Sequence, residues 1–174
     1  GLTHPKEDKM KKWLIVLMAG MVLFISGCKE EAPSSDGSGE SQEQVAHDGW
    51  ITDFEKARAT AKDENKHILI DFSGSDWCGW CIKLDQEVFS QPAFKEYARD
   101  NLVLVMADFP RNKSNQSAEL QKQNEKLMQE YGVRGFPTVF ILSPEGAAID
   151  KTGYQDGGPE AYVEYIKKVI ADAK

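Results

Sequence analysis

The stretch HILIDFSGSDWCGWC, residues 67–81, decides the fold of this 174-residue chain. Its first six residues are an apolar run that predicts a buried strand, and Cys78 and Cys81 follow at the start of an expected helix. Two thiols three positions apart within one helical turn can approach closely enough to form a disulfide. Free backbone N–H groups at a helix N-terminus favour the thiolate of Cys78, which is the form that attacks disulfides. The stretch therefore predicts a redox pair in which Cys78 attacks and Cys81 resolves the mixed disulfide.

Three other roles for the cysteine pair can be weighed from the sequence. A zinc site would need two more soft ligands, and the chain offers only Cys28 and three histidines without paired spacing, His4, His47 and His67. Covalent haem attachment would need a histidine directly after Cys81, where Ile82 stands. A purely structural disulfide stays open, because oxidised pairs are common outside the cytoplasm. We therefore expect no metal and no organic cofactor.

A second motif, YGVRGFPTVFIL, occupies residues 131–142. With it the sequence resembles the thioredoxin superfamily, in which a Gly-x-Pro-Thr segment with a cis proline opens a central strand. The resemblance implies that Pro137 packs against the cysteine pair and that Phe136 offers its backbone to an extended substrate peptide. Taken alone, Pro137 could be an ordinary strand-opening proline. Because both motifs occur in the expected order, we expect an α/β, thioredoxin-like fold with a central mixed sheet flanked by helices.

The rest of the chain fits this order, and the foldable domain is expected over residues 46–174. The first helix is expected within 50–66, where Thr52 and Glu55 form a capping-box pattern. Ser90 is expected to cap the helix that begins at Pro92. Apolar periodicity predicts strands at 67–73, 102–107, 138–142 and 147–152, and helices at 79–89, 92–99, 118–131 and 159–172.

More closely, the sequence resembles the periplasmic C-terminal domain of transmembrane thiol-disulfide interchange proteins. The shared pattern is a Trp-Cys-x-x-Cys helix that runs into VFSQP, residues 88–92. The resemblance implies a reductase that acts on disulfide-bonded protein substrates and takes electrons from a membrane donor. Trp77 and Trp80 are aromatic residues beside the thiols, and we expect them in the substrate-binding surface; the alternative for Trp80 is a surface aromatic without a role. The chain departs from ordinary thioredoxin in having Gly79-Trp80 between the cysteines and one extra residue between Asp71 and Cys78.

Asp71 interrupts the apolar strand that leads to the cysteines. A buried carboxylate is unfavourable unless it is protonated or paired. In thioredoxins an aspartate at the matching position lies behind the second cysteine, and the resemblance implies that Asp71 takes the proton of Cys81 through a water. The alternative is an aspartate that faces solvent at the end of the strand.

The N-terminus predicts export and lipid attachment. Lys11 and Lys12 precede a 14-residue apolar stretch, 13–26, which falls short of the roughly 20 residues that span a bilayer. Residues 25–28, ISGC, resemble the bacterial lipobox, which implies lipidation of Cys28. We expect a signal peptide over 1–28, of which 1–9 is an upstream extension, and a flexible tether over 29–45. The expected location is the periplasmic side of a bacterial membrane, inner or outer; the alternative is an uncleaved signal anchor.

Charge narrows the choice of partners. After position 28 the chain carries 17 basic and 26 acidic residues, a net charge of −9, which argues against nucleic acid as a partner. Two function classes remain. The first is a membrane-tethered thiol-disulfide oxidoreductase, and the second is a redox-inactive module that holds clients on the surface around Phe136 and Trp80.

Overall fold

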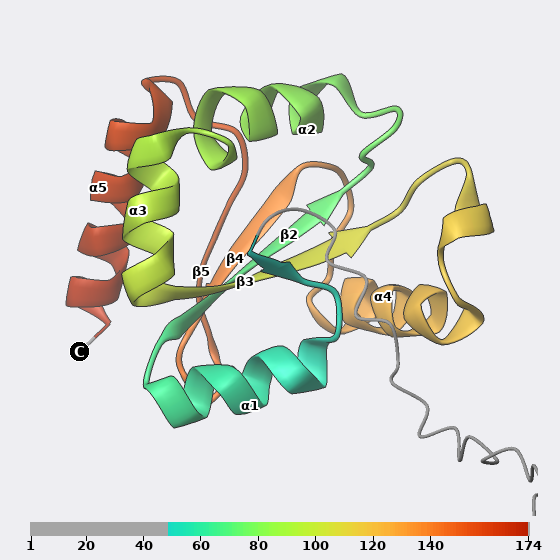
Figure 1. Ribbon diagram of the computed structural model, residues 1–174, viewed down its shortest axis with the longest axis horizontal. Helices are drawn as coiled ribbons and strands as arrows, with labels where there is room; N and C mark the ends of the chain where they lie inside the picture. The colour runs from blue at the N-terminus through green and yellow to red at the C-terminus, as the bar shows by residue number, and fades with distance from the viewer. Residues whose placement is uncertain (1–48, 174) are drawn as a thin grey trace, which may run out of the picture. The chain divides into compact units, whose positions relative to one another are not determined.

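The computed structural model describes residues 49–173 as one sheet covered by helices (Figure 1). Its elements in chain order are β1 (Trp50–Ile51), α1 (Phe54–Glu64), β2 (His67–Ser73), α2 (Gly79–Leu84), the π-helical turn η1 (Asp85–Phe89), α3 (Pro92–Asn101), β3 (Leu102–Asp108), the 3-10 turn η2 (Lys113–Asn115), α4 (Ala118–Glu130), β4 (Thr138–Leu142), β5 (Ala148–Thr152) and α5 (Gly158–Asp172). Among these residues, none of the helices has the length and apolarity that crossing a bilayer requires.

The five strands lie in the order β1-β3-β2-β4-β5. β3 runs parallel to both β1 and β2, whereas β4 runs antiparallel to β2 and β5. The expected mixed sheet is confirmed, with the strand that leads to the cysteines at its centre. The sequence missed β1, and Trp50–Ile51 pairs with β3 instead of beginning the first helix.

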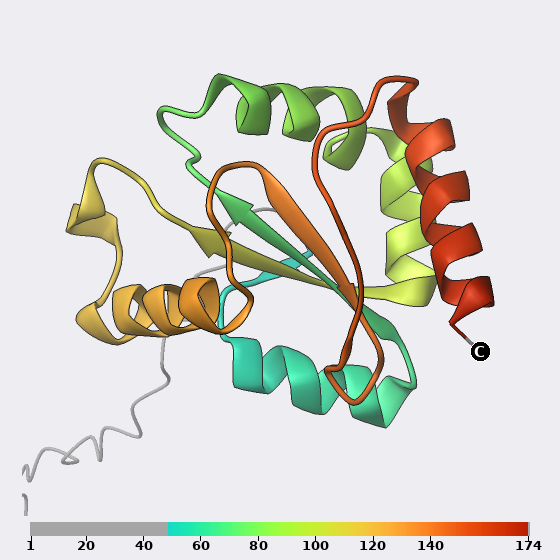
Figure 2. The same cartoon turned by 180° about the vertical axis from the view of Figure 1, so that it is seen from behind.

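Helices cover both faces of the sheet, as the two opposite views show (Figures 1 and 2). Side chains of β2 alternate between the faces. Ile68, Ile70 and Phe72 pack with α1 and α4, whereas Leu69 packs with α2, η1, α3 and α5. Asp71 shares the strand parity of Leu69, so it faces the side that the cysteine helix covers.

An aromatic cluster fixes η1, the turn that follows the cysteine helix, against α3 and α5. The ring centroid of Phe89 in η1 lies 4.9 Å from that of Phe94 in α3 and 5.8 Å from that of Tyr162 in α5. All three side chains are fully buried. Burial of each contributes on the order of 2 kcal/mol, so η1, and with it the end of α2, is held firmly against α3 and α5.

Two expected helix caps are wrong. Asp53, not Thr52, caps α1, because its carboxylate accepts a hydrogen bond from the Lys56 amide at 3.0 Å. Ser90 does not cap α3. Its hydroxyl donates instead to the Asp85 carboxylate at 3.1 Å and closes the π-helical turn.

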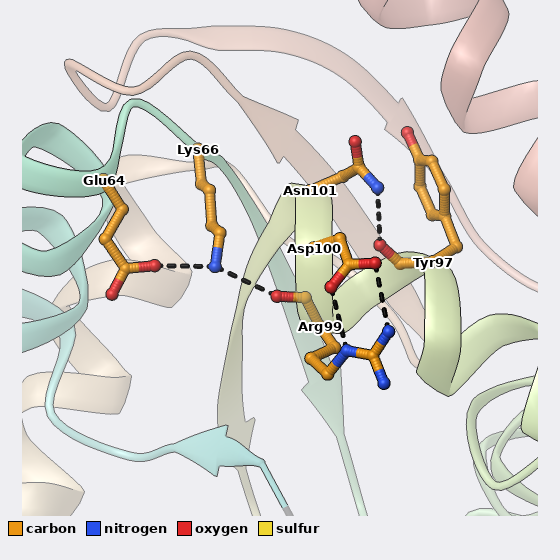
Figure 3. A network of polar contacts seen from close by, with 6 residues as sticks. All are labelled: Glu64, Lys66, Tyr97, Arg99, Asp100 and Asn101. Atoms are coloured by element: carbon orange, nitrogen blue, oxygen red, sulfur yellow. Dashed lines mark hydrogen bonds and ion pairs between the residues drawn. The ribbon is translucent and has the colours of Figure 1, made fainter.

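A polar network ties the start of β2 to the end of α3 (Figure 3). The Lys66 ammonium donates to the Arg99 carbonyl at 3.0 Å and pairs with the Glu64 carboxylate at 2.6 Å. The Asn101 amide donates to the Tyr97 carbonyl at 2.8 Å. This network lies at the end of the sheet where β2 and β3 begin, whereas the cysteines follow the opposite end of β2.

Candidate active site

Cys78 and Cys81 form a disulfide at the N-terminus of α2, with Cα atoms 5.2 Å apart. Cys78 is the N-cap residue, and its sulfur accepts a hydrogen bond from the Cys81 amide at 3.2 Å. Both residues are buried. A sulfur in this position faces the free N–H groups of the first helical turn, which stabilise a thiolate once the disulfide is reduced.

Trp77 joins the cysteine loop to two other loops. Its indole N–H donates to the Phe109 carbonyl at 2.8 Å, and its ring meets the edge of the Phe136 ring at 5.8 Å between centroids. Phe136 in turn stacks on Phe109 at 5.2 Å, and the Arg111 guanidinium lies 5.7 Å from the Trp77 ring centroid. The loops after β2, after β3 and before β4 therefore form one aromatic surface next to the disulfide.

Trp80 lies in a separate cluster between α2 and the loop after β5. Its ring centroid is 5.2 Å from that of Tyr154, and the Lys83 ammonium lies 5.0 Å and 4.6 Å from the two rings. The Tyr154 hydroxyl donates to the Glu87 carboxylate at 2.6 Å. This cluster leaves Trp80 58% exposed, compared with 40% for Trp77.

The Phe136–Pro137 peptide bond is cis, as the sequence predicts. Thr138 anchors this loop by donating a hydroxyl hydrogen bond to the Gly135 carbonyl at 2.8 Å. The loop after β5 approaches closely, because a Cβ atom on Gly153 would lie 3.1 Å from the Pro137 carbonyl oxygen. Glycine therefore lets two loops meet at the proline that the sequence assigns to the substrate-binding surface.

Asp71 lies under the cysteine helix and is only 3% exposed. Within residues 49–173 its Oδ1 atom has no hydrogen-bond partner. Burial, followed by the charges of Asp108 and Asp85, raises the pKa of Asp71 to about 8. The solvent-facing alternative is therefore wrong. A carboxyl group with this pKa can exchange a proton with a thiol near neutral pH.

The structure thus brings Trp77, Phe136 and the cysteines into one neighbourhood, with Asp71 on the buried side. Cys28 lies outside the described residues. Sequence reasoning missed four residues around the disulfide, Lys83, Phe109, Arg111 and Tyr154. A signal existed for two of them, since Phe109 and Arg111 follow the carboxyl end of a strand parallel to β2, and such ends meet at one edge of a sheet. Residues 49–173 contain no cluster of three potential metal ligands from His, Cys, Asp and Glu.

A disulfide that opens a helix after the central strand, beside a cis-proline loop, defines the class of thioredoxin-like thiol-disulfide oxidoreductases. A family model described as a thioredoxin-like domain matches residues 54–170, and the chain belongs to this family. It is 32% identical over 168 residues to the disulfide bond reductase DsbH of Chlamydia pneumoniae, covering 92% of this chain and 98% of that protein.

Solved structures agree with this assignment. A DsbH oxidoreductase structure superposes with a TM-score of 0.66 at 33% identity, covering 77% of this chain and 95% of the other. The reduced C-terminal domain of Neisseria meningitidis DsbD gives a TM-score of 0.50 at 22% identity, over 66% of this chain and 91% of that domain. The second likeness is one of fold.

Proposed function

We propose that this protein reduces disulfides in client proteins on the periplasmic side of a bacterial membrane, with Cys78 as nucleophile and Cys81 as resolving thiol. The observation that carries the proposal is the Cys78–Cys81 pair at the N-terminus of α2, with buried Asp71, whose Oδ1 atom has no hydrogen-bond partner among the described residues, on the buried side of that helix. The reducing direction is supported by the name of the C. pneumoniae relative, a disulfide bond reductase.

The reaction has two steps. The Cys78 thiolate attacks one sulfur of the client disulfide, so that a mixed disulfide forms and the other client sulfur leaves as a thiolate. Cys81 then loses its proton, through a water, to ionised Asp71 and attacks the Cys78 sulfur, which releases the second client sulfur. Two electrons pass from the pair to the client, and Cys78–Cys81 ends as a disulfide. With a pKa of about 8, Asp71 is mostly protonated near pH 7, and its ionised fraction is the form that takes the proton from Cys81. A base whose pKa lies near the operating pH can both take up and release a proton.

The client binds across the exposed aromatic surface around the disulfide. Among the described residues, the large apolar side chains that stay exposed are Trp77, Trp80 and Ile82, all within six positions around the cysteines. Phe136 and Pro137 border this surface from the loop before β4 and offer backbone to an extended peptide. Apolar surface gathered at one place on a protein commonly marks a binding site.

The oxidised pair must be reduced again after each client. Electrons come from a membrane donor in this proposal, and a lipid on Cys28 holds the protein at that membrane. Residues 29–45, which are rich in Glu, Ser and Gly and lie outside the described residues, are the proposed tether between the anchor and the domain. The signal peptide with its lipobox over 1–28, in which Cys28 is the lipidated residue that stays on the protein, and the thioredoxin-like domain over 46–174 complete this organisation.

The anchor is tested by Cys28→Ser. This variant should move from the membrane fraction to the soluble fraction, while its purified domain keeps full reductase activity because the tether separates the two. A variant that stays membrane-bound after detergent-free washing would show that the N-terminal segment is an uncleaved anchor.

The reductase proposal is tested by Cys81→Ser expressed in the native cells. Without its resolving thiol, Cys78 should accumulate as mixed disulfides with clients, visible as bands that disappear on reduction. In the unaltered protein, Cys78 and Cys81 should be mostly thiols in cells and should become oxidised when the membrane donor is removed. Clients that copurify without any covalent bond would favour the redox-inactive binding module instead.

A further inference from the structure

We propose that Asp108 is a positioning residue for Cys78. It holds the loop between β2 and α2 in place, so that the Cys78 sulfur stays at the helix N-terminus after the disulfide has been opened. The inference deepens the proposed function and rests on it.

Asp108 binds the cysteine loop directly. At the end of β3, its Oδ1 atom accepts a hydrogen bond from the Ser75 amide at 2.9 Å, and its Oδ2 atom accepts one from the Ser75 hydroxyl at 2.6 Å. Both donors of Ser75 are therefore satisfied by a single carboxylate. Bonds to an ionised acceptor are the stronger class of hydrogen bond.

The backbone of Asp108 is fixed from the other side. Its carbonyl accepts hydrogen bonds from the side-chain amides of Gln116 and Asn124, each at 3.0 Å. Asn124 belongs to α4 and is only 1% exposed. The next residue, Phe109, donates its amide to the Ser73 carbonyl at 2.8 Å and extends the pairing of β2 with β3. Asp108 thus connects a buried position of α4 to the loop that carries Cys78.

Asp76 and Trp77 strengthen the same connection. The Asp76 carboxylate accepts from the Arg111 amide at 2.9 Å and the Asn112 amide at 3.2 Å, and these bonds lower the pKa of Asp76. Trp77 donates to the Phe109 carbonyl. Three consecutive residues before Cys78 are therefore bound to residues 108–112. We call this set of contacts between 75–77 and 108–112 the loop clamp.

The polar groups beside the loop clamp are already occupied. A cavity of about 390 Å³ lies next to it and is lined by Ser75, Asp76, Asp108, Asn112, Gln116 and Asn124 among others. Most of these side chains bond to one another or to neighbouring backbone. Such a lining holds loops together, so it supports a positioning role instead of a ligand site.

The loop clamp matters most in the reduced protein. In the oxidised protein the covalent bond to Cys81 also restrains Cys78. After reduction this restraint is gone, and the Cys78 amide bond to the Gly74 carbonyl, 2.8 Å long, depends on residues 74–77 keeping their path. Loss of the loop clamp should therefore destabilise the reduced form more than the oxidised form, because the thiolate leaves the N–H groups that stabilise it.

The test is the equilibrium of each full-length variant with reduced and oxidised glutathione. Asp108→Ala should favour the oxidised pair by about tenfold, equivalent to about 30 mV for a two-electron couple, and should slow alkylation of Cys78 near neutral pH. Ser75→Ala removes only the hydroxyl bond and should act in the same direction by about threefold, the range of a single lost cap. Asp108→Asn keeps an acceptor for the Ser75 amide and should fall between Ser75→Ala and the unaltered protein.

The matched control is Asp100→Asn. It removes a hydrogen-bonded carboxylate near the opposite end of β3, where Asp100 pairs with Arg99 (Figure 3), and should leave the equilibrium unchanged. If Asp108→Ala does not fold, Ser75→Ala still tests the proposal, because it removes only the hydroxyl bond to Asp108.

Three results would overturn the proposal. Variants that unfold more readily but keep the glutathione equilibrium would show a merely structural role. If Asp108→Asn shifts the glutathione equilibrium as much as Asp108→Ala, the negative charge of Asp108 sets this equilibrium and the hydrogen bonds of the loop clamp do not. An unaltered pair that does not exchange with glutathione would remove the proposed function itself, and this inference with it.

Discussion

The two sides of the Cys78–Cys81 disulfide differ in exposure and in side-chain chemistry. On the outer side lie Trp77 and Trp80, 40% and 58% exposed. On the inner side lies Asp71, 3% exposed and with a pKa raised to about 8 by burial. Exposed aromatic surface suits contact with a client, and a carboxyl group shielded from water suits proton transfer. One helix N-terminus therefore separates a binding surface from a proton site.

Cys78 forms the bond to the client and is then attacked by Cys81, so its loss should have the largest effect. Cys78→Ser should abolish client reduction, because no thiolate remains to form the mixed disulfide. An assay of reduction of a disulfide-bonded model protein would measure this. Cys28→Ser serves as the matched cysteine control and should keep the full rate. Residual turnover by Cys78→Ser at a rate near that of the unaltered protein would mean that Cys81 attacks first.

Asp71→Asn removes the proton site on the inner side of the disulfide and should alter how the free energy of unfolding depends on pH. Because the pKa is raised in the folded state, the folded protein holds a proton between about pH 4 and pH 8 that the unfolded chain has released. The free energy of unfolding of the unaltered protein should therefore fall as pH rises through this range. Between pH 5 and pH 7 the loss relative to Asp71→Asn should be about 3 kcal/mol.

Urea unfolding of both oxidised proteins at the two pH values measures this difference. The variant should also release clients more slowly, because Cys81 loses its proton acceptor. If the free energies of unfolding of the two proteins change equally with pH, Asp71 keeps an ordinary pKa and is not the proton site on the inner side of the disulfide.

Trp77→Ala tests the outer side of the disulfide at a residue that is partly exposed yet held in place by its contacts. Its indole hydrogen bond and its contact with Phe136 join three loops. We expect a loss of about 2 kcal/mol in the free energy of unfolding, below the range for fully buried aromatic residues because the ring is partly exposed. Thermal unfolding would measure it. An unchanged melting temperature would mean that these contacts do not hold the loops.

Trp80→Ala should have the smallest effect on stability and a selective effect on clients. Trp80 contacts Tyr154 and Lys83 at the surface, and such contacts contribute under about 1 kcal/mol. The KM for a protein client should rise several-fold, while reduction of a small disulfide stays unchanged. Tyr97→Ala, which removes another ring in contact with a lysine, Lys167, at the end of the sheet away from the cysteines, is the matched control. Equal effects on large and small substrates would place Trp80 outside the client surface.

Local sequence patterns were sufficient for most of the fold. Periodicity located β2 and β4 to the residue, because long apolar runs bounded by turns leave little choice of register. It missed β1, since two residues carry no period and Trp50–Ile51 becomes a strand only by pairing with β3. The cap of α1 was placed one residue early because Thr52 and Asp53 are both good capping residues, and only the backbone path decides between them.

The candidate site could be predicted where its chemistry lies in short motifs. Cys78, Cys81 and the cis bond before Pro137 follow from such motifs. The contacts between Ser75 and Asp108 could not, because the two residues are 33 positions apart and each occurs in a polar segment typical of any loop. The burial of Asp71 was likewise left open, since a charged residue near the end of a strand can face either way.

Whether Cys78 and Cys81 form a working reductant is tested most directly by a redox titration of the pair in glutathione and dithiothreitol buffers, followed by acid quenching and alkylation. We expect reversible two-electron exchange with a midpoint between about −270 and −200 mV, the range of thioredoxin-type and glutaredoxin-type reductants. A midpoint near −120 mV would make the protein an oxidant and contradict the reducing direction. A disulfide that resists all of these buffers would show that the pair is structural and would contradict the account as a whole.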